Sequence, residues 1–187
     1  MGTHRRSLLD LFDKYSPDIN ERAIMERAII SGAFRADKER RIVEVSVELP
    51  MTIPKEMLYQ LEKSISDVYK LRYVRIFPKY DRSLFTQEYF SQIMIEAKRR
   101  DLISENFLRN YKVVFSNGEI QIQMGFGKGG VNLLNAAHTA SKIEEIMESE
   151  FGFRMKIEFE SNDSIDVGYK VNLEERLAKI TAKKTVI

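Results

Sequence analysis

The clearest pattern along the chain is a strict alternation of apolar and polar residues over positions 43–49, which read VEVSVEL. A period of two is typical of a β-strand with one face in the core and the other in solvent. The charged run DKERR before it predicts a turn, so we expect a hairpin over 27–49. Pro50 and Pro54 follow, and Pro54 suits the first turn of a helix.

After Pro54 the apolar residues change to the spacing of a helix. In segment 55–69 they recur every three or four positions, which predicts a helix with one buried side: Met57, Leu58, Leu61, Ile65, Val68 and Tyr69. The segment RYVRIF, residues 72–77, then predicts a strand.

The second half of the chain repeats this order. Residues 86–100 predict a helix and residues 111–124 a hairpin, whose Asn-Gly dipeptide at 117–118 suits a type I′ turn. One long helix is expected over 132–150. The segment FRMKIEFE after it predicts a strand with Ile157 facing the core.

The repeated order of hairpin, helix and strand predicts an α+β fold with two small α/β-sandwich-like domains, each a three-stranded sheet with helices. We expect an N-terminal domain over residues 1–82 and a second domain over 83–163. The polar segment 164–187 is expected to be a linker or a short helix. A chain of 187 residues with 43% hydrophobic content is long enough to build these cores.

Composition narrows the classes of function. The chain has no cysteine, which excludes disulfides, zinc–thiolate sites and a thiol nucleophile. No apolar run approaches the roughly 20 residues of a membrane span, and acidic residues interrupt the apolar run at the N-terminus, which argues against a secretory signal. We therefore expect a cytoplasmic protein that has no membrane partner.

The net charge of +2 is weak evidence for a polyanionic partner, but its distribution is informative. Residues 1–82 carry 16 basic and 13 acidic side chains, whereas residues 83–163 carry 9 and 12. The second predicted domain is therefore the acidic one, and a nucleic-acid surface is typically basic.

The segment MGFGKGGVNLL, residues 124–134, places four glycines around one lysine between a predicted strand and a predicted helix. Backbone N–H groups at a helix start can bind an anion. The segment lacks the Lys-Ser/Thr ending of a P-loop and the parallel βαβ unit of a dinucleotide site. Gly127, Lys128, Gly129 and Gly130 have the spacing of the GXXG clamp of KH domains, but that clamp joins two helices. We expect a structural turn, with nucleic-acid contact by these four residues as the alternative.

Other candidates for chemistry are weaker. Lys98, Arg99 and Arg100 end a predicted helix, where they would complement its dipole or contact phosphate. His4 and His138 are far apart and have no paired carboxylate, so they predict neither a metal site nor a catalytic dyad.

Four acidic residues are expected on an ordinary solvated helix face: Glu144, Glu145, Glu148 and Glu150. No catalytic residue, cofactor, metal ion or small-molecule substrate is predicted.

Segment 43–69, VEVSVELPMTIPKEMLYQLEKSISDVY, resembles the first N-terminal module of the PolC-type DNA polymerase III alpha subunit of Gram-positive bacteria. In that module a strand ends in a proline, and a helix that begins with proline carries leucines. Segments 88–124 and 151–163 resemble the second module, which has a type II KH-like fold. The resemblance covers about residues 8–163 and consists of hydrophobic and turn patterns. The glycines at 125–130 depart from it.

The resemblance implies that the chain is a fragment of a longer polymerase. The parent chain would be a DNA-directed DNA polymerase with 3′–5′ exonuclease activity, and this region would carry none of its catalytic residues. The implied role in DNA replication is docking to other replisome proteins. Binding of single-stranded nucleic acid by the KH-like module is the alternative.

Overall fold

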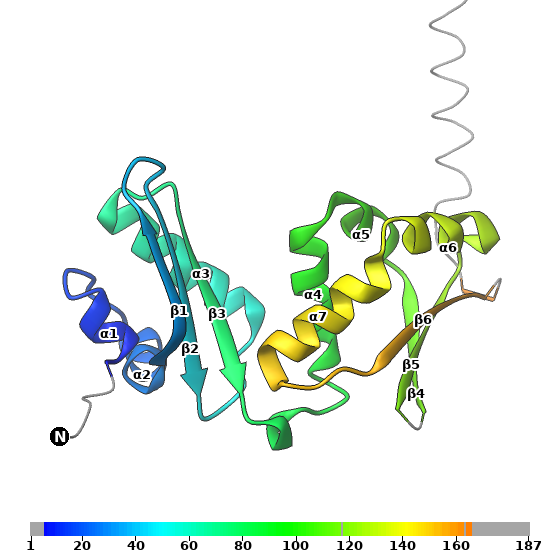
Figure 1. Ribbon diagram of the computed structural model, residues 1–187, viewed down its shortest axis with the longest axis horizontal. Helices are drawn as coiled ribbons and strands as arrows, with labels where there is room; N and C mark the ends of the chain where they lie inside the picture. The colour runs from blue at the N-terminus through cyan, green and yellow to red at the C-terminus, as the bar shows by residue number, and fades with distance from the viewer. Residues whose placement is uncertain (1–5, 117, 163, 166–187) are drawn as a thin grey trace, which may run out of the picture. The chain divides into compact units, whose positions relative to one another are not determined.

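The computed structural model describes residues 6–116, 118–162 and 164–165 (Figure 1). Three expectations therefore fall outside the described residues. They concern His4, position 117 of the predicted hairpin turn, and nearly all of the predicted linker or helix over 164–187.

The described chain divides into two compact units. One consists of the residues up to Glu96 together with Glu145–Arg154, and the other contains the rest. Each unit has one three-stranded sheet. The predicted domain limit between residues 82 and 83 stays a prediction.

The first unit begins with two short helices, α1 (Leu8–Leu11) and α2 (Ile19–Arg27). Both have a capping box. The side chains of Ser7 and Asp18 accept backbone N–H groups of the first turn, and the acid three residues later accepts the N–H of the cap. These reciprocal bonds satisfy donors that a helix start otherwise leaves unpaired.

Three strands form the sheet of this unit: β1 (Ile29–Asp37), β2 (Ile42–Leu49) and β3 (Tyr73–Tyr80). The central strand β2 is antiparallel to β1 and parallel to β3. A parallel pair needs a crossover connection, and helix α3 (Lys55–Tyr69) supplies it, lying along one face of the sheet (Figure 1). The short 3-10 helix η1 (Arg82–Leu84) follows β3.

The core of the first unit lies between α3 and the sheet. Val45 and Val47 of β2 are fully buried, as the alternation predicts. Leu58, Leu61 and Ile65 of α3 are buried as well. Full burial of an aliphatic side chain is worth about 1.5–3 kcal/mol, so the apolar side of α3 stabilises its position on the sheet.

The second sheet has the strands β4 (Tyr111–Ser116), β5 (Glu119–Met124) and β6 (Lys156–Ser161). The central strand β5 is antiparallel to β4 and parallel to β6. Helices α4 (Phe90–Arg100) and α5 (Leu102–Phe107) precede this sheet.

Two helices, α6 (Gly127–Ala136) and α7 (Thr139–Phe151), connect β5 to β6. The single helix predicted over 132–150 is therefore wrong. The helix is interrupted at Ala137 and His138, and His138 has a φ of 55° in the left-handed region. Neither residue is a helix breaker by type, so the apolar spacing gave no sign of the break.

The predicted fold class is confirmed, because the chain has a mixed α/β structure with two three-stranded sheets and helices. Both units follow the same order of hairpin, crossover connection and parallel third strand.

Each unit also has its own polar contact between the crossover connection and the outer strand, and the two contacts are of the same kind. In the first unit the N–H of Ile76 donates to Oε1 of Glu62 at 2.8 Å. In the second, the N–H of Ile157 donates to Oε1 of Glu144 at 2.9 Å. Both acceptors satisfy N–H groups of sheet-edge strands, which are otherwise exposed to pairing with another chain. The prediction that Glu144 lies on an ordinary solvated face is therefore wrong.

Candidate functional site

Three of the four glycines, Gly127, Gly129 and Gly130, lie in the first turn of α6, whereas Gly125 lies in the bend before the helix. Gly127 is the first residue of the helix and has a positive φ of 62°. Gly129 is exposed with open space around it, whereas Gly130 is buried against Phe126. A Cβ atom on Gly130 would lie 2.5 Å from the Cβ of Phe126. Gly127 therefore provides the left-handed conformation with which α6 begins, while Gly130 provides close packing against Phe126.

The position of these glycines differs from that of a KH-type clamp. The GXXG loop of KH domains joins two helices, and the turn between α6 and α7 contains Ala137 and His138. Lys128 is exposed in the first turn of α6. Contact of nucleic acid with Gly127, Lys128, Gly129 and Gly130 stays a prediction.

Alanine substitutions at Gly130 and Gly129 should change stability in opposite directions. Gly130→Ala forces a Cβ against Phe126, whose ring packs on Phe107 at a centroid distance of 5.4 Å. We expect a loss of about 1–3 kcal/mol from this overpacking. Gly129→Ala replaces an exposed helical glycine and should add up to about 1 kcal/mol. Thermal denaturation measures both, and equal stability of the two variants would contradict the role of Gly130.

The basic cluster Lys98, Arg99 and Arg100 forms the last turn of α4, where it complements the helix dipole. The Nζ atom of Lys98 lies 5.5 Å from the ring centre of Tyr111. Burial lowers the pKa of Lys98, and the charge of Arg109 lowers this pKa further. The neighbours of Lys98 are thus Tyr111 and Arg109, and the glycines of α6 are not among them. Phosphate contact by the cluster stays a prediction.

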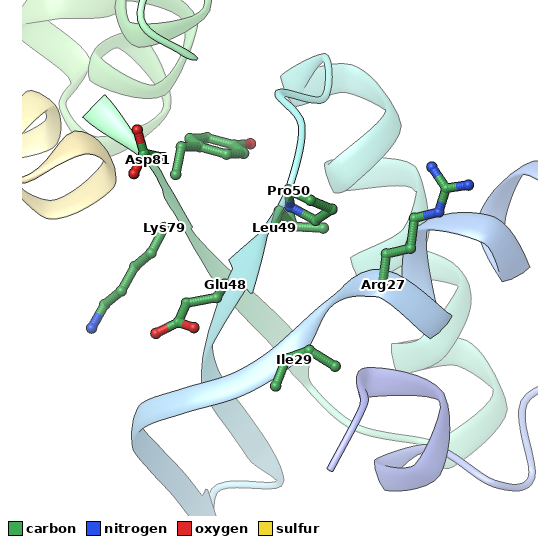
Figure 2. A pocket seen from close by; sticks show the side chains of 8 residues that line it. Arg27, Ile29, Glu48, Leu49, Pro50, Lys79 and Asp81 are labelled. Atoms are coloured by element: carbon green, nitrogen blue, oxygen red, sulfur yellow. The ribbon is translucent and has the colours of Figure 1, made fainter. Parts of the chain in front are cut away.

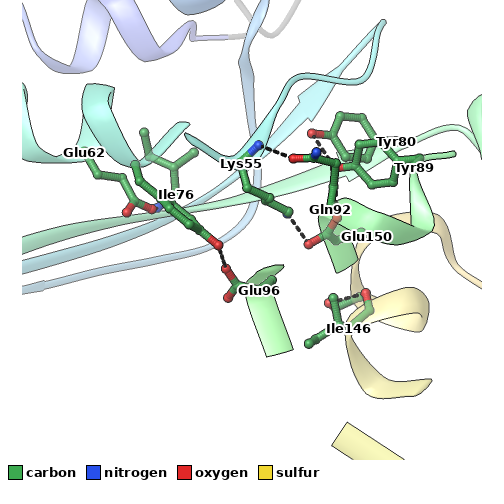
Figure 3. Close-up of polar contacts among 11 residues, drawn as sticks. Lys55, Glu62, Ile76, Tyr80, Tyr89, Gln92, Glu96, Ile146 and Glu150 are labelled. Atoms are coloured by element: carbon green, nitrogen blue, oxygen red, sulfur yellow. Dashed lines mark hydrogen bonds and ion pairs between the residues drawn. The ribbon is translucent and has the colours of Figure 1, made fainter. Parts of the chain in front are cut away.

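A buried ion pair that the sequence did not reveal lies in the first unit (Figure 3). Nζ of Lys55, at the start of α3, contacts Oε1 of Glu150, near the end of α7, and their side chains are 1% and 4% exposed. The hydroxyl of Tyr89 donates to Oε2 of Glu150 at 3.2 Å. The backbone N–H of Lys55 donates to Oε1 of Gln92 at 2.7 Å. The prediction that Glu150 lies on a solvated face is therefore wrong.

Burial governs the electrostatics of this network. It raises the pKa of Glu150, and the ammonium group of Lys55 opposes that shift. Burial also raises the pKa of Tyr89 and of Tyr80, whose hydroxyl groups are 3.3 Å apart, and the charge of Glu150 adds to both shifts. A lysine, a carboxylate and neutral tyrosines that satisfy one another in this way are typical of a structural ion pair.

A hollow of about 540 Å³ opens where β2 and β3 end (Figure 2). Leu49 and Tyr80 are nearly buried in its floor, and Ile29 and Pro50 lie beside them. Its remaining lining residues are charged: Arg27, Glu48, Lys79 and Asp81. The carboxyl ends of parallel strands are a common binding position in α/β folds, and this volume lies within the usual range of binding pockets.

The hollow combines an apolar floor with charges of both signs. Two cations and two anions give its lining no net charge, which suits neither a polyanion nor a polycation. No local pattern in the sequence predicts this hollow, because its residues come from α2, β1, β2, β3 and the segments that follow the last two.

In the part of the chain that the structure describes, no group of three or more acidic or histidine side chains is placed to hold a metal ion. His138 is exposed in the turn between α6 and α7. No helix among the same residues is both long and apolar enough to cross a membrane.

A comparison of the chain with models of known protein families finds no match, and a search of curated proteins finds no significant relative.

Proposed function

We propose that this chain is a non-catalytic docking module that binds replisome proteins in DNA replication, similar to the N-terminal region of a PolC-type DNA polymerase III alpha subunit. The observation that carries the docking role is the hollow at the ends of β2 and β3. An apolar floor with a charged rim suits an apolar side chain of a partner protein and the polar groups that flank it. The link to replication rests on the sequence resemblance over about residues 8–163.

Binding of single-stranded nucleic acid by the second unit is the second candidate. It is favoured by the position of Lys98 beside the ring of Tyr111, with the charge of Arg109 close enough to act on Lys98, since cations next to aromatic rings are common in proteins that bind single strands. Two observations argue against nucleic-acid binding. Residues 83–163 have more acidic than basic side chains, and the turn between α6 and α7 contains no glycine. Docking is therefore the preferred role.

Binding assays with individually purified replisome proteins and with a fluorescein-labelled oligo-dT strand would distinguish the two candidates. We expect one replisome protein to bind with a micromolar or lower Kd. Lys79→Glu in the rim of the hollow should weaken this binding about tenfold or more, which is a loss of at least about 1.4 kcal/mol. Lys112→Glu is the matched control, because Lys112 is also an exposed strand lysine but lies in the second unit.

The opposite result would favour nucleic-acid binding. It would consist of salt-dependent binding of the oligonucleotide that Lys98→Ala removes, with no replisome protein bound. Equal binding of a replisome protein by Lys79→Glu and the wild type would show that docking does not use the hollow.

A further inference from the structure

The outer edge of β3 is closed to another strand. Every second residue of an edge strand turns its N–H away from the sheet. At Val74 and Ile76 these groups donate at 2.8 Å to Oγ of Ser66 and Oε1 of Glu62 in α3. Pro78 is the next outward position and has no N–H. A partner strand would therefore find no free N–H at these three positions.

The outer edge of β1 is closed only at its start. There the N–H of Ile30 donates to the carbonyl of Arg6 at 2.9 Å, and Ser7 forms a bridge with Ile29. The chain itself thus shows that this edge accepts an added segment. A register shift follows between Ile30 and Phe34.

Beyond this shift the edge of β1 is open. Ile30 lies opposite Val47 and points its N–H outward, so the alternation places the N–H and C=O of Phe34 and Ala36 outward as well, opposite Val45 and Val43. Within the described residues, β1 pairs with β2 and with Ser7, and no strand or side chain pairs with these outward groups.

The exposure of Phe34 is a second indication that another strand can pair with β1. It lies opposite the fully buried Val45 and therefore on the core side of the sheet, yet it is 49% exposed. Side chains directly across from each other on paired strands contact one another. An added strand would cover the exposed part of Phe34.

The surface beside this open edge is basic. Arg35 is 56% exposed at the edge, and its only salt bridge among the described residues is to Glu44 at 3.4 Å. Arg72 joins the turn after β1, because its N–H donates to the carbonyl of Arg41 at 2.7 Å. Residues 34–41 hold four basic and two acidic side chains: Arg35, Lys38, Arg40 and Arg41, against Asp37 and Glu39. This charge complements an acidic partner.

We propose that an acidic, extended segment of a partner protein binds as a fourth strand along Phe34–Asp37 of β1. Its backbone pairs with the outward groups of Phe34 and Ala36, as in other complexes formed by strand addition. One apolar side chain of the segment covers Phe34, and its acidic side chains meet Arg35 and Lys38. This inference rests on the docking function proposed above but concerns a different surface from the hollow.

A labelled peptide of alternating valine and glutamate tests this site, and a peptide of alternating valine and lysine is the charge control. We expect saturable fluorescence anisotropy with the acidic peptide alone. Its binding should slow hydrogen exchange at the amides of Phe34 and Ala36. Ala36→Pro removes one outward N–H and leaves the ladder to β2 intact, so it should weaken binding about tenfold or more. Ala36→Val keeps the N–H and is the matched control.

A second variant keeps the test decisive if Ala36→Pro fails to fold. Lys38 is exposed, so Lys38→Glu should leave the melting temperature unchanged and also reduce binding of the acidic peptide.

Three results would overturn the inference. The first is the absence of saturable binding of the acidic peptide up to millimolar concentration. The second is an oligonucleotide that competes with the peptide and binds Ala36→Pro normally, which would assign the basic surface to phosphate. The third is a replisome protein that binds the wild type and Ala36→Pro equally, which would leave the docking function standing. Peptide binding at β1 without any replisome protein bound would count against the proposed function alone.

Discussion

Glu150→Ala and Lys55→Ala should each lower the free energy of unfolding by about 3–5 kcal/mol. Either substitution leaves the other charge buried without its ion-pair partner, since both side chains are less than 5% exposed. The stability of a whole domain is about 5–15 kcal/mol, so this loss is a large part of the total. Urea denaturation followed by circular dichroism measures the change.

Two controls separate the cost of an unpaired buried charge from the value of the pair itself. Lys55→Met combined with Glu150→Leu removes both charges and keeps their bulk, so its stability should return close to that of the wild type. Lys63→Ala breaks an exposed ion pair with Asp67. The two side chains of this pair are 77% and 66% exposed, so the substitution should lower the free energy of unfolding by at most about 0.5 kcal/mol. Equal losses for Glu150→Ala and Lys63→Ala would contradict burial of the Lys55–Glu150 pair.

Leu61→Ala should lower the free energy of unfolding by about 2–5 kcal/mol, because it opens a cavity between α3 and the first sheet. Leu61 is 1% exposed, as its spacing predicts, whereas Val68 of the same helix is 49% exposed, so the prediction that Val68 lies on the buried side is wrong. Val68→Ala is therefore the matched control and should change stability by at most about 0.5 kcal/mol. Thermal or urea denaturation of both variants gives the comparison.

The same contrast applies to the second unit. Ile157 of β6 is 5% exposed and Val114 of β4 is 36% exposed, so Ile157→Ala should cost more than Val114→Ala. A loss for Val68→Ala or Val114→Ala as large as that of its buried counterpart would mean that the inward faces are assigned wrongly.

Much of the fold can be predicted from local patterns. The alternation over 43–49 predicts β2 and its buried valines, and the spacing over 55–69 predicts α3 with Leu61 in the core. The repeated order of elements predicts two three-stranded sheets. These predictions succeed because the period of apolar residues directly reflects the geometry of a strand or a helix.

The proposed binding surfaces were less accessible to sequence analysis. The hollow brings together Arg27, Glu48 and Lys79 from separate elements, and no motif links them. The edge of β3 is closed because α3 supplies acceptors for its N–H groups, and the edge of β1 stays open beyond the short segment at Arg6 and Ser7 that pairs with its start. Both surfaces follow from how elements pack and not from the residues of one segment.

The sequence alone therefore determined the type and order of most elements, because strand and helix periods are local properties of the chain. Tertiary structure decided the roles of Glu150, Glu144 and the glycines. Glu150 has helical spacing like its exposed neighbours, and only packing brings it to Lys55, 95 residues away in the sequence. In the sequence Gly130 does not differ from Gly129, and only the packing of Phe126 against Gly130 separates their roles. Periodicity indicates which side of an element is buried, but the partner that covers a given side chain depends on contacts between distant segments.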